Sequence, residues 1–158
     1  MVLKSCIFSL LIACNFIASN HSKDFYNALF GSSQTIIDRV LNDLEKQTKN
    51  DNTAAYKGAL MMKKSEFLKS PKEKIDLFKK GRQLLDSAID NAPGNAEYRF
   101  IRLTIQEHAP KILKYNRNIS EDKSMILGGF SKMESTTQKY VLDYAGVSEL
   151  IKTEELSR

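Results

Sequence analysis

The stretch DNAPGNAEYRFIR, residues 90–102, places a proline and a glycine between two segments that have the periodicity of helices. In residues 72–91, and again in residues 96–108, apolar side chains recur at intervals of three and four positions, which places them on one face of a helix. Proline and glycine interrupt regular helices. The stretch therefore predicts a helical hairpin whose turn contains Pro93 and Gly94.

The other periodic segments of the chain are helical too. The same spacing predicts helices at residues 22–30, 35–47, 53–69, 120–133 and 135–145. Ser70 is expected to cap the 72–91 helix, with Pro71 in its first turn, and Ser120 is expected to cap the helix that follows it. We therefore predict an all-α fold, a compact bundle of antiparallel helical hairpins.

Small residues indicate where two of these helices pack closely. The 53–69 helix has Ala55 and Ala59 on its apolar side, which allows a neighbouring helix to approach. Gly81 lies inside the 72–91 helix, where a glycine costs about 1 kcal/mol relative to alanine. A glycine at this position predicts a close crossing with another helix.

The hairpin resembles a known repeat family. The second helix and turn of a tetratricopeptide repeat are similar to the run Gly81, Leu85, Ala88, Pro93, Asn95, Ala96 and Glu97. The resemblance covers about one repeat and aligns Leu68 with the first helix, with Lys69 where the family has a glycine. Because a solenoid needs about three repeats, we expect one repeat-like hairpin within the bundle. The resemblance implies a groove that binds proteins or peptides.

The body of the chain is also similar to a group of small secreted helical proteins of Bacteroidetes bacteria. The segments LFKKGRQLLD, residues 77–86, and RFIRLTIQEHAPKILKYNRNISEDK, residues 99–123, carry this resemblance. It implies an exported helical protein and supplies no activity.

Residues 1–20 have the features of an export signal. One basic residue, Lys4, precedes an apolar run at residues 5–13 that is too short to span a bilayer, and small residues follow. Cleavage near residue 20 would leave residues 21–158 as one helical domain in the periplasm or outside the cell, with a frayed tail from residue 147. In the alternative interpretation, residues 11–14 form a lipobox, and Cys14 anchors the protein to the outer membrane.

Composition limits the possible partners. The chain of 158 residues has 42% hydrophobic and 27% charged residues, as globular proteins have. A net charge of +5 is only mildly basic, so we expect no nucleic-acid partner. Residues 57–82 nevertheless contain nine lysines and arginines against three acids. They form either solvated helix faces or a patch for an acidic partner or a membrane surface.

The sequence contains little that indicates catalysis. Both cysteines lie in the predicted signal, so the body lacks a thiol nucleophile, and no metal-site or cofactor motif is present. His108, at a helix end, is expected to be structural. We therefore predict a protein that is not an enzyme and has no cofactor or metal. The alternative is a small exported hydrolase whose carboxylates are brought together by folding.

One polar face is the candidate binding site. Arg99, Arg102 and Gln106 follow at helical spacing, so they share one face of the 96–108 helix. They either pair with acids of a neighbouring helix or bind the carboxylate or peptide of a partner, with Tyr98 and Tyr115 at the edge of the groove. The preferred hypothesis is a non-catalytic adaptor domain that holds a protein or peptide segment. The oligomeric state stays open.

Overall fold

The computed structural model describes residues 21–156, and these residues form helices without a strand among them. A helix at residues 21–30 is followed by α2 (Gln34–Glu45), α3 (Asp51–Lys64), α4 (Pro71–Asn91), α5 (Ala96–His108), α6 (Ile119–Gly129), α7 (Ser135–Ala145) and α8 (Thr153–Leu156). Three-residue 3₁₀ turns lie at Ser65–Phe67, Lys111–Leu113 and Phe130–Lys132. The predicted all-α bundle is confirmed. The predicted cleavage site and Cys14 lie outside the described residues.

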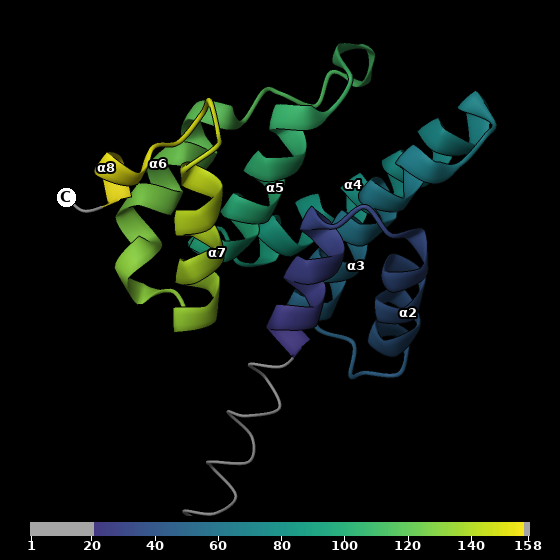
Figure 1. Cartoon of the computed structure of the whole chain (residues 1–158), viewed down its shortest axis with the longest axis horizontal. Helices are drawn as coiled ribbons and strands as arrows, with labels where there is room; N and C mark the ends of the chain where they lie inside the picture. Colours follow the sequence, from purple (N-terminus) through teal and green to yellow (C-terminus); the bar gives the residue numbers. More distant parts are fainter. Residues whose placement is uncertain (1–20, 157–158) are drawn as a thin grey trace, which may run out of the picture.

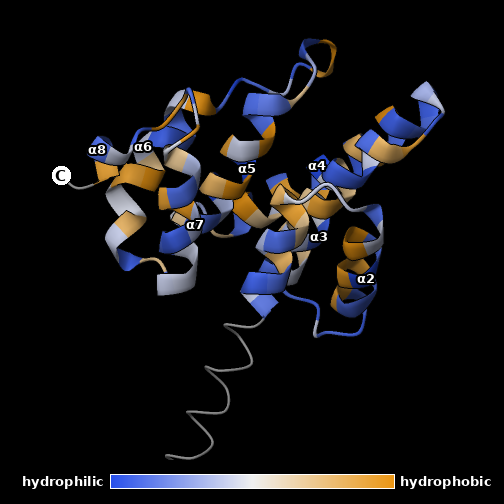
Figure 2. Ribbon diagram, in the orientation of Figure 1, coloured by the Kyte–Doolittle hydropathy of each residue, from blue (hydrophilic) through white to orange (hydrophobic). Residues whose placement is uncertain are grey.

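The helices lie in two groups with α5 between them. Figure 1 shows α2, α3 and α4 on one side of the view and α6, α7 and α8 on the other. Hydrophilic and hydrophobic residues share the same helices, most clearly α2 and α4 in Figure 2, as expected where one face of a helix is buried. Within residues 21–156, no helix combines the length and the apolar character needed to cross a bilayer.

Short polar side chains cap the starts of α5 and α4, of which the cap of α4 was predicted. The side chain of Asn95 accepts hydrogen bonds from the backbone N–H groups of Glu97 and Tyr98, which caps α5. At the start of α4, the Ser70 hydroxyl accepts from the N–H of Glu73, and Pro71 occupies the first turn. Both helix starts therefore follow from short side chains next to the helix.

The close crossing predicted from Gly81 is confirmed, and its partner is Gly58 of α3. A Cβ atom on Gly58 would lie 2.5 Å from the carbonyl oxygen of Gly81, and a Cβ atom on Gly81 would overlap the carbonyl oxygen of Gly58. The two backbones touch, so a side chain larger than hydrogen does not fit at either position. This crossing fixes α3 and α4 as an antiparallel pair (Figure 1).

The predicted end of α3 was wrong. The helix ends at Lys64 rather than at residue 69, and a 3₁₀ turn follows, in which the Ser65 hydroxyl donates to the Met62 carbonyl. Leu68 and Lys69 lie in the connection to α4, outside any helix. Aligning them with the first helix of a repeat was therefore also wrong.

Aromatic side chains of the 21–30 helix join both groups of helices. The ring of Phe25 stacks on Tyr56 of α3 with centroids 3.8 Å apart. The ring of Tyr26 lies 4.5 Å from that of Tyr140 in α7 and 6.2 Å from that of Phe100 in α5. Phe25, Tyr26 and Phe100 are 0% exposed, so these contacts form the centre of the core.

The C-terminal third differs from the prediction at two places. The cap position of α6 is Asn118, so Ser120 lies inside the first turn and is not the cap. The tail, expected to fray from residue 147, contacts the body: Ile151 is 0% exposed, and the Glu107 carboxylate accepts hydrogen bonds from the Ser148 hydroxyl and the Glu149 N–H.

Candidate functional site

The two arginines of the predicted site are buried between α5 and α6. Arg99 is 6% exposed and Arg102 is 5% exposed, and both donate to the carboxylate of Asp122, which is 0% exposed. The Nε and Nη2 atoms of Arg102 each lie 2.7 Å from an oxygen of Asp122, which is a bidentate pair. The Nη1 atom of Arg99 lies 3.2 Å from the same carboxylate. We call these three residues, together with Glu121, Asp86 and Tyr115, the arginine network.

The outer members of the arginine network connect three helices. Glu121 accepts from Arg99 at 2.9 Å, and Asp86 of α4 accepts from Arg102 at 3.2 Å. The Tyr115 hydroxyl donates to the same carboxylate of Asp86 at 2.9 Å. Arg99 also donates to the carbonyl oxygen of Pro93, at 3.1 and 3.3 Å, which ties the turn between α4 and α5 to α5. The guanidinium groups therefore have their partners within the chain.

The pKa shifts in the arginine network agree with this structural role. Burial lowers the pKa of Arg102, but the hydrogen bonds and negative charge of Asp122 raise it above the ordinary value. Burial raises the pKa of Tyr115, and the negative charge of Asp86 adds to the effect. The positive charge of Arg99 lowers the pKa of Glu121. These shifts favour the charged forms of Arg102 and Glu121 and the neutral form of Tyr115.

The remaining residues of the predicted site lie apart from one another. Tyr98 is 5% exposed and lies near the start of α3, where burial and the negative charge of Glu97 raise its pKa to about 12. Gln106 is 4% exposed, and within the described residues neither atom of its side-chain amide has a hydrogen-bond partner. The structure therefore brings Arg99, Arg102 and Tyr115 into one network but does not place Tyr98 in it.

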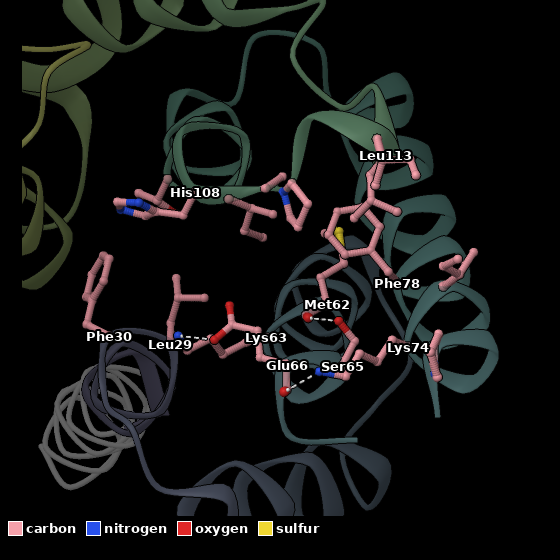
Figure 3. A pocket seen from close by; sticks show the side chains of 17 residues that line it. Leu29, Phe30, Met62, Lys63, Ser65, Glu66, Lys74, Phe78, His108 and Leu113 are labelled. Atoms are coloured by element: carbon pink, nitrogen blue, oxygen red, sulfur yellow. Dashed lines mark hydrogen bonds and ion pairs between the residues drawn. The ribbon is translucent and has the colours of Figure 1, made fainter. Parts of the chain in front are cut away.

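A different part of the molecule contains an open cavity. It lies where the 21–30 helix, α3 and α5 end and α4 begins, and its volume is about 730 Å³. We call it the apolar groove; its lining is Leu29, Phe30, Met62, Lys63, Ser65, Glu66, Pro71, Lys74, Ile75, Phe78, Thr104, Ile105, His108, Ala109, Pro110, Ile112 and Leu113. Figure 3 shows Phe30 and His108 on opposite sides of one end, and Phe78 with Leu113 at the other end.

Large apolar side chains at the edge of the apolar groove are exposed to solvent. Phe30 is 41% exposed, Ile75 is 37% exposed and Ile112 is 82% exposed, while Met62 and Phe78 below them are buried. Exposed apolar residues that gather around a hollow are typical of binding sites, whereas scattered ones carry no such meaning. The sequence alone does not reveal this site, because its lining comes from segments far apart in the chain.

The hydroxyl groups of the apolar groove are already used inside the protein. Ser65 donates to the Met62 carbonyl at 2.6 Å, and Thr104 donates to the Ile101 carbonyl at 2.8 Å. The Lys63 ammonium lies 2.8 Å from the Glu66 carboxylate (Figure 3). An occupant is therefore recognised mainly through apolar contact.

A second, smaller cavity of about 230 Å³ lies beside Tyr56 and Glu97. The Glu97 carboxylate accepts hydrogen bonds from the hydroxyl groups of Tyr26, Tyr56 and Thr137, at 2.9, 2.7 and 3.2 Å. Three donors on one carboxylate join the 21–30 helix, α3, α5 and α7, which is a structural function. No group of three or more His, Cys, Asp or Glu side chains in residues 21–156 is arranged to hold a metal ion.

The comparisons with known proteins leave the geometry as the basis for function. No protein-family model, no curated protein and no solved structure matches this chain. The similarity to a tetratricopeptide hairpin and to secreted proteins of Bacteroidetes therefore stays a prediction.

Proposed function

We infer that this is a non-catalytic binding protein that holds an apolar segment of a partner protein in the apolar groove. The observation that carries the inference is a cavity of about 730 Å³ surrounded by the exposed side chains of Phe30, Ile75 and Ile112. Its size falls in the range of roughly 300–1,000 Å³ that is common for binding sites. An amphipathic helix that places its apolar face in such a groove is a recurring mode of recognition.

The chemistry of the walls supports an apolar occupant. Ser65 and Thr104 donate their hydroxyl protons inside the chain, so sugars and other polar molecules would find few free partners. Apolar side chains need no such partners, and the burial of their surface stabilises the complex. A peptide segment with several large apolar residues therefore fits the site better than a polar metabolite.

The carboxylates give no support to the alternative of a hydrolase. Partial burial raises the pKa of Glu107, but hydrogen bonds from Ser148, Tyr144 and the Glu149 N–H lower it below the ordinary value. A general acid requires the opposite shift. Glu121, next to Arg99, is shifted downwards as well.

The proposed binding site differs from the one expected from the sequence. Arg99 and Arg102 have acids of α4 and α6 as partners, so a carboxylate from outside would have to displace them. The apolar groove requires no such displacement. With the export signal predicted at residues 1–20, we place the partner in the periplasm or at the cell envelope.

Ile112 and Val147 provide a matched pair of variants that tests binding in the apolar groove. Ile112, at the edge of the apolar groove, is 82% exposed, and Val147, outside its lining, is 81% exposed. Binding of a fluorescent leucine-rich amphipathic peptide is measured for Ile112→Ser and Val147→Ser. We expect Ile112→Ser to weaken binding about tenfold, since burying its side chain contributes about 1.5 kcal/mol or more. Equal affinity of the two variants would contradict the proposal.

A further inference from the structure

The charged residues at the edge of the apolar groove indicate which partner it prefers. On α4 the lining residues Pro71, Lys74, Ile75 and Phe78 follow the spacing of one helical face. Each residue turns the helix by about 100°, so Glu73 and Asp76 lie on the other side of α4. The helix therefore presents a lysine to the groove and no acid.

Lys74 has a positive charge without a carboxylate partner in the described part of the chain. Its ammonium group donates to the backbone carbonyl of Glu66 at 3.0 Å, which leaves the charge uncompensated. The Glu66 carboxylate is occupied by Lys63 at 2.8 Å. Figure 3 shows Lys74, Glu66 and Lys63 along the same wall of the groove. The net charge of this wall is therefore positive.

The opposite lip has the same sign. The segment of residues 109–114 contains Lys111 and Lys114 and no acid. Lys111 is exposed and lies between the lining residues Pro110 and Ile112 in the chain, although it is not itself part of the lining. The apolar floor thus has the ammonium group of Lys74 at one wall, and Lys111 lies next to the lining residues of the opposite edge.

We propose that the partner segment carries acidic residues beside its apolar ones, so that its carboxylates meet Lys74 and Lys111 while its apolar side chains enter the groove. This rests on the proposed function and adds the chemistry of the partner to it. Complementary charge at the edge of an interface speeds association and fixes orientation, and its effect decreases with salt.

The shape of the site favours a protein segment over a membrane surface. Met62 is 2% exposed and Phe78 is 6% exposed, so the apolar floor of the groove is buried below its exposed edge. A bilayer surface would take up only the exposed edge residues Phe30, Ile75 and Ile112, whereas the floor requires an occupant that enters the cavity. A separate segment with side chains of its own can reach this floor.

Two synthetic amphipathic peptides with the same leucine pattern test the proposal, one with glutamate and one with lysine at the flanking positions. Affinity for the full chain is measured by fluorescence anisotropy at about 0.05 M and about 0.5 M salt. We expect the glutamate peptide to bind about tenfold tighter at low salt, and the difference to shrink at high salt. In Lys74→Gln combined with Lys111→Gln the preference is expected to fall to about twofold or less, whereas Lys80→Gln, on the far side of α4, keeps it.

The possible outcomes separate the two proposals. Equal affinity of the two peptides at both salt concentrations would overturn the acidic partner and leave the apolar groove as a binding site. Binding of neither peptide would overturn both proposals. Binding of the full chain to anionic phosphatidylglycerol vesicles, without binding of either peptide, would assign the lysines to a membrane surface and likewise overturn the acidic segment.

Discussion

Replacing Asp122 by asparagine tests the arginine network, because this carboxylate is 0% exposed and pairs with both Arg99 and Arg102. The variant keeps the size of the side chain and removes its charge. Arg102, itself 5% exposed, then loses its bidentate partner and keeps only Asp86 at 3.2 Å. The matched control is Glu121→Gln, since Glu121 pairs with Arg99 in the same network but its side chain is 56% exposed.

The expected magnitudes follow from burial. Removing one partner of a buried ion pair leaves an uncompensated charge and costs about 3–5 kcal/mol. That is a large share of the roughly 5–15 kcal/mol by which a typical domain is stable. The exposed pair of the control is worth about 1 kcal/mol or less. Asp122→Asn is therefore expected to lower the free energy of unfolding by at least about 3 kcal/mol and Glu121→Gln by less than about 1 kcal/mol.

Urea unfolding followed by circular dichroism measures both variants. The dependence of the unfolding free energy on urea should stay the same, because the surface exposed on unfolding does not change. A loss below about 1 kcal/mol for Asp122→Asn, or equal losses in the two variants, would show that these charges are solvated. The buried arginine network would then be wrong.

Two further predictions concern the core. In urea unfolding, Gly58→Ala is expected to destabilise the protein by about 1–3 kcal/mol, because the new Cβ would meet the Gly81 backbone. Gly128→Ala has open space around it and is expected to stabilise the protein by up to about 1 kcal/mol. A Gly58→Ala variant of unchanged stability would refute the crossing. Burial raises the pKa of Tyr26, Tyr56, Tyr115 and Tyr144 far above the ordinary 10.0, so the unfolded chain releases protons that the folded one keeps. Stability should be full below pH 10 and should fall above it by up to about 1.4 kcal/mol per pH unit for each of Tyr26, Tyr56, Tyr115 and Tyr144. Tyrosinate absorbance should rise together with the loss of helix, and ionisation of these tyrosines in the folded protein would refute their burial.

Local features of the fold could be predicted from the sequence, because they depend on neighbouring residues. Helical periodicity gave the helices, Ser70 and Pro71 gave the start of α4, and Gly81 indicated the close crossing. The end of α3 was missed, because apolar spacing continues through Phe67 and does not distinguish the 3₁₀ turn at Ser65–Phe67 from a further turn of α-helix.

The sites depend on contacts between distant segments, which a single sequence does not show. Asp122 looked like an ordinary acid near a helix start, and only the packing of α6 on α5 buries it against Arg102. The apolar groove is formed by four segments, at residues 29–30, 62–66, 71–78 and 104–113, and its exposed edge residues Ile75 and Ile112 each follow a lysine in the sequence. Their spacing therefore predicted helix faces and loops but no cavity.

The most direct test of the binding site is a map of the residues that contact the glutamate-flanked peptide. Backbone amide signals of the full chain are followed by NMR during a titration with that peptide. We predict that the shifted signals belong to residues 62–66, 74–78 and 104–113, which line the apolar groove. Shifts confined to α6 and α7, or scattered over the whole chain, would contradict the groove as the site of binding.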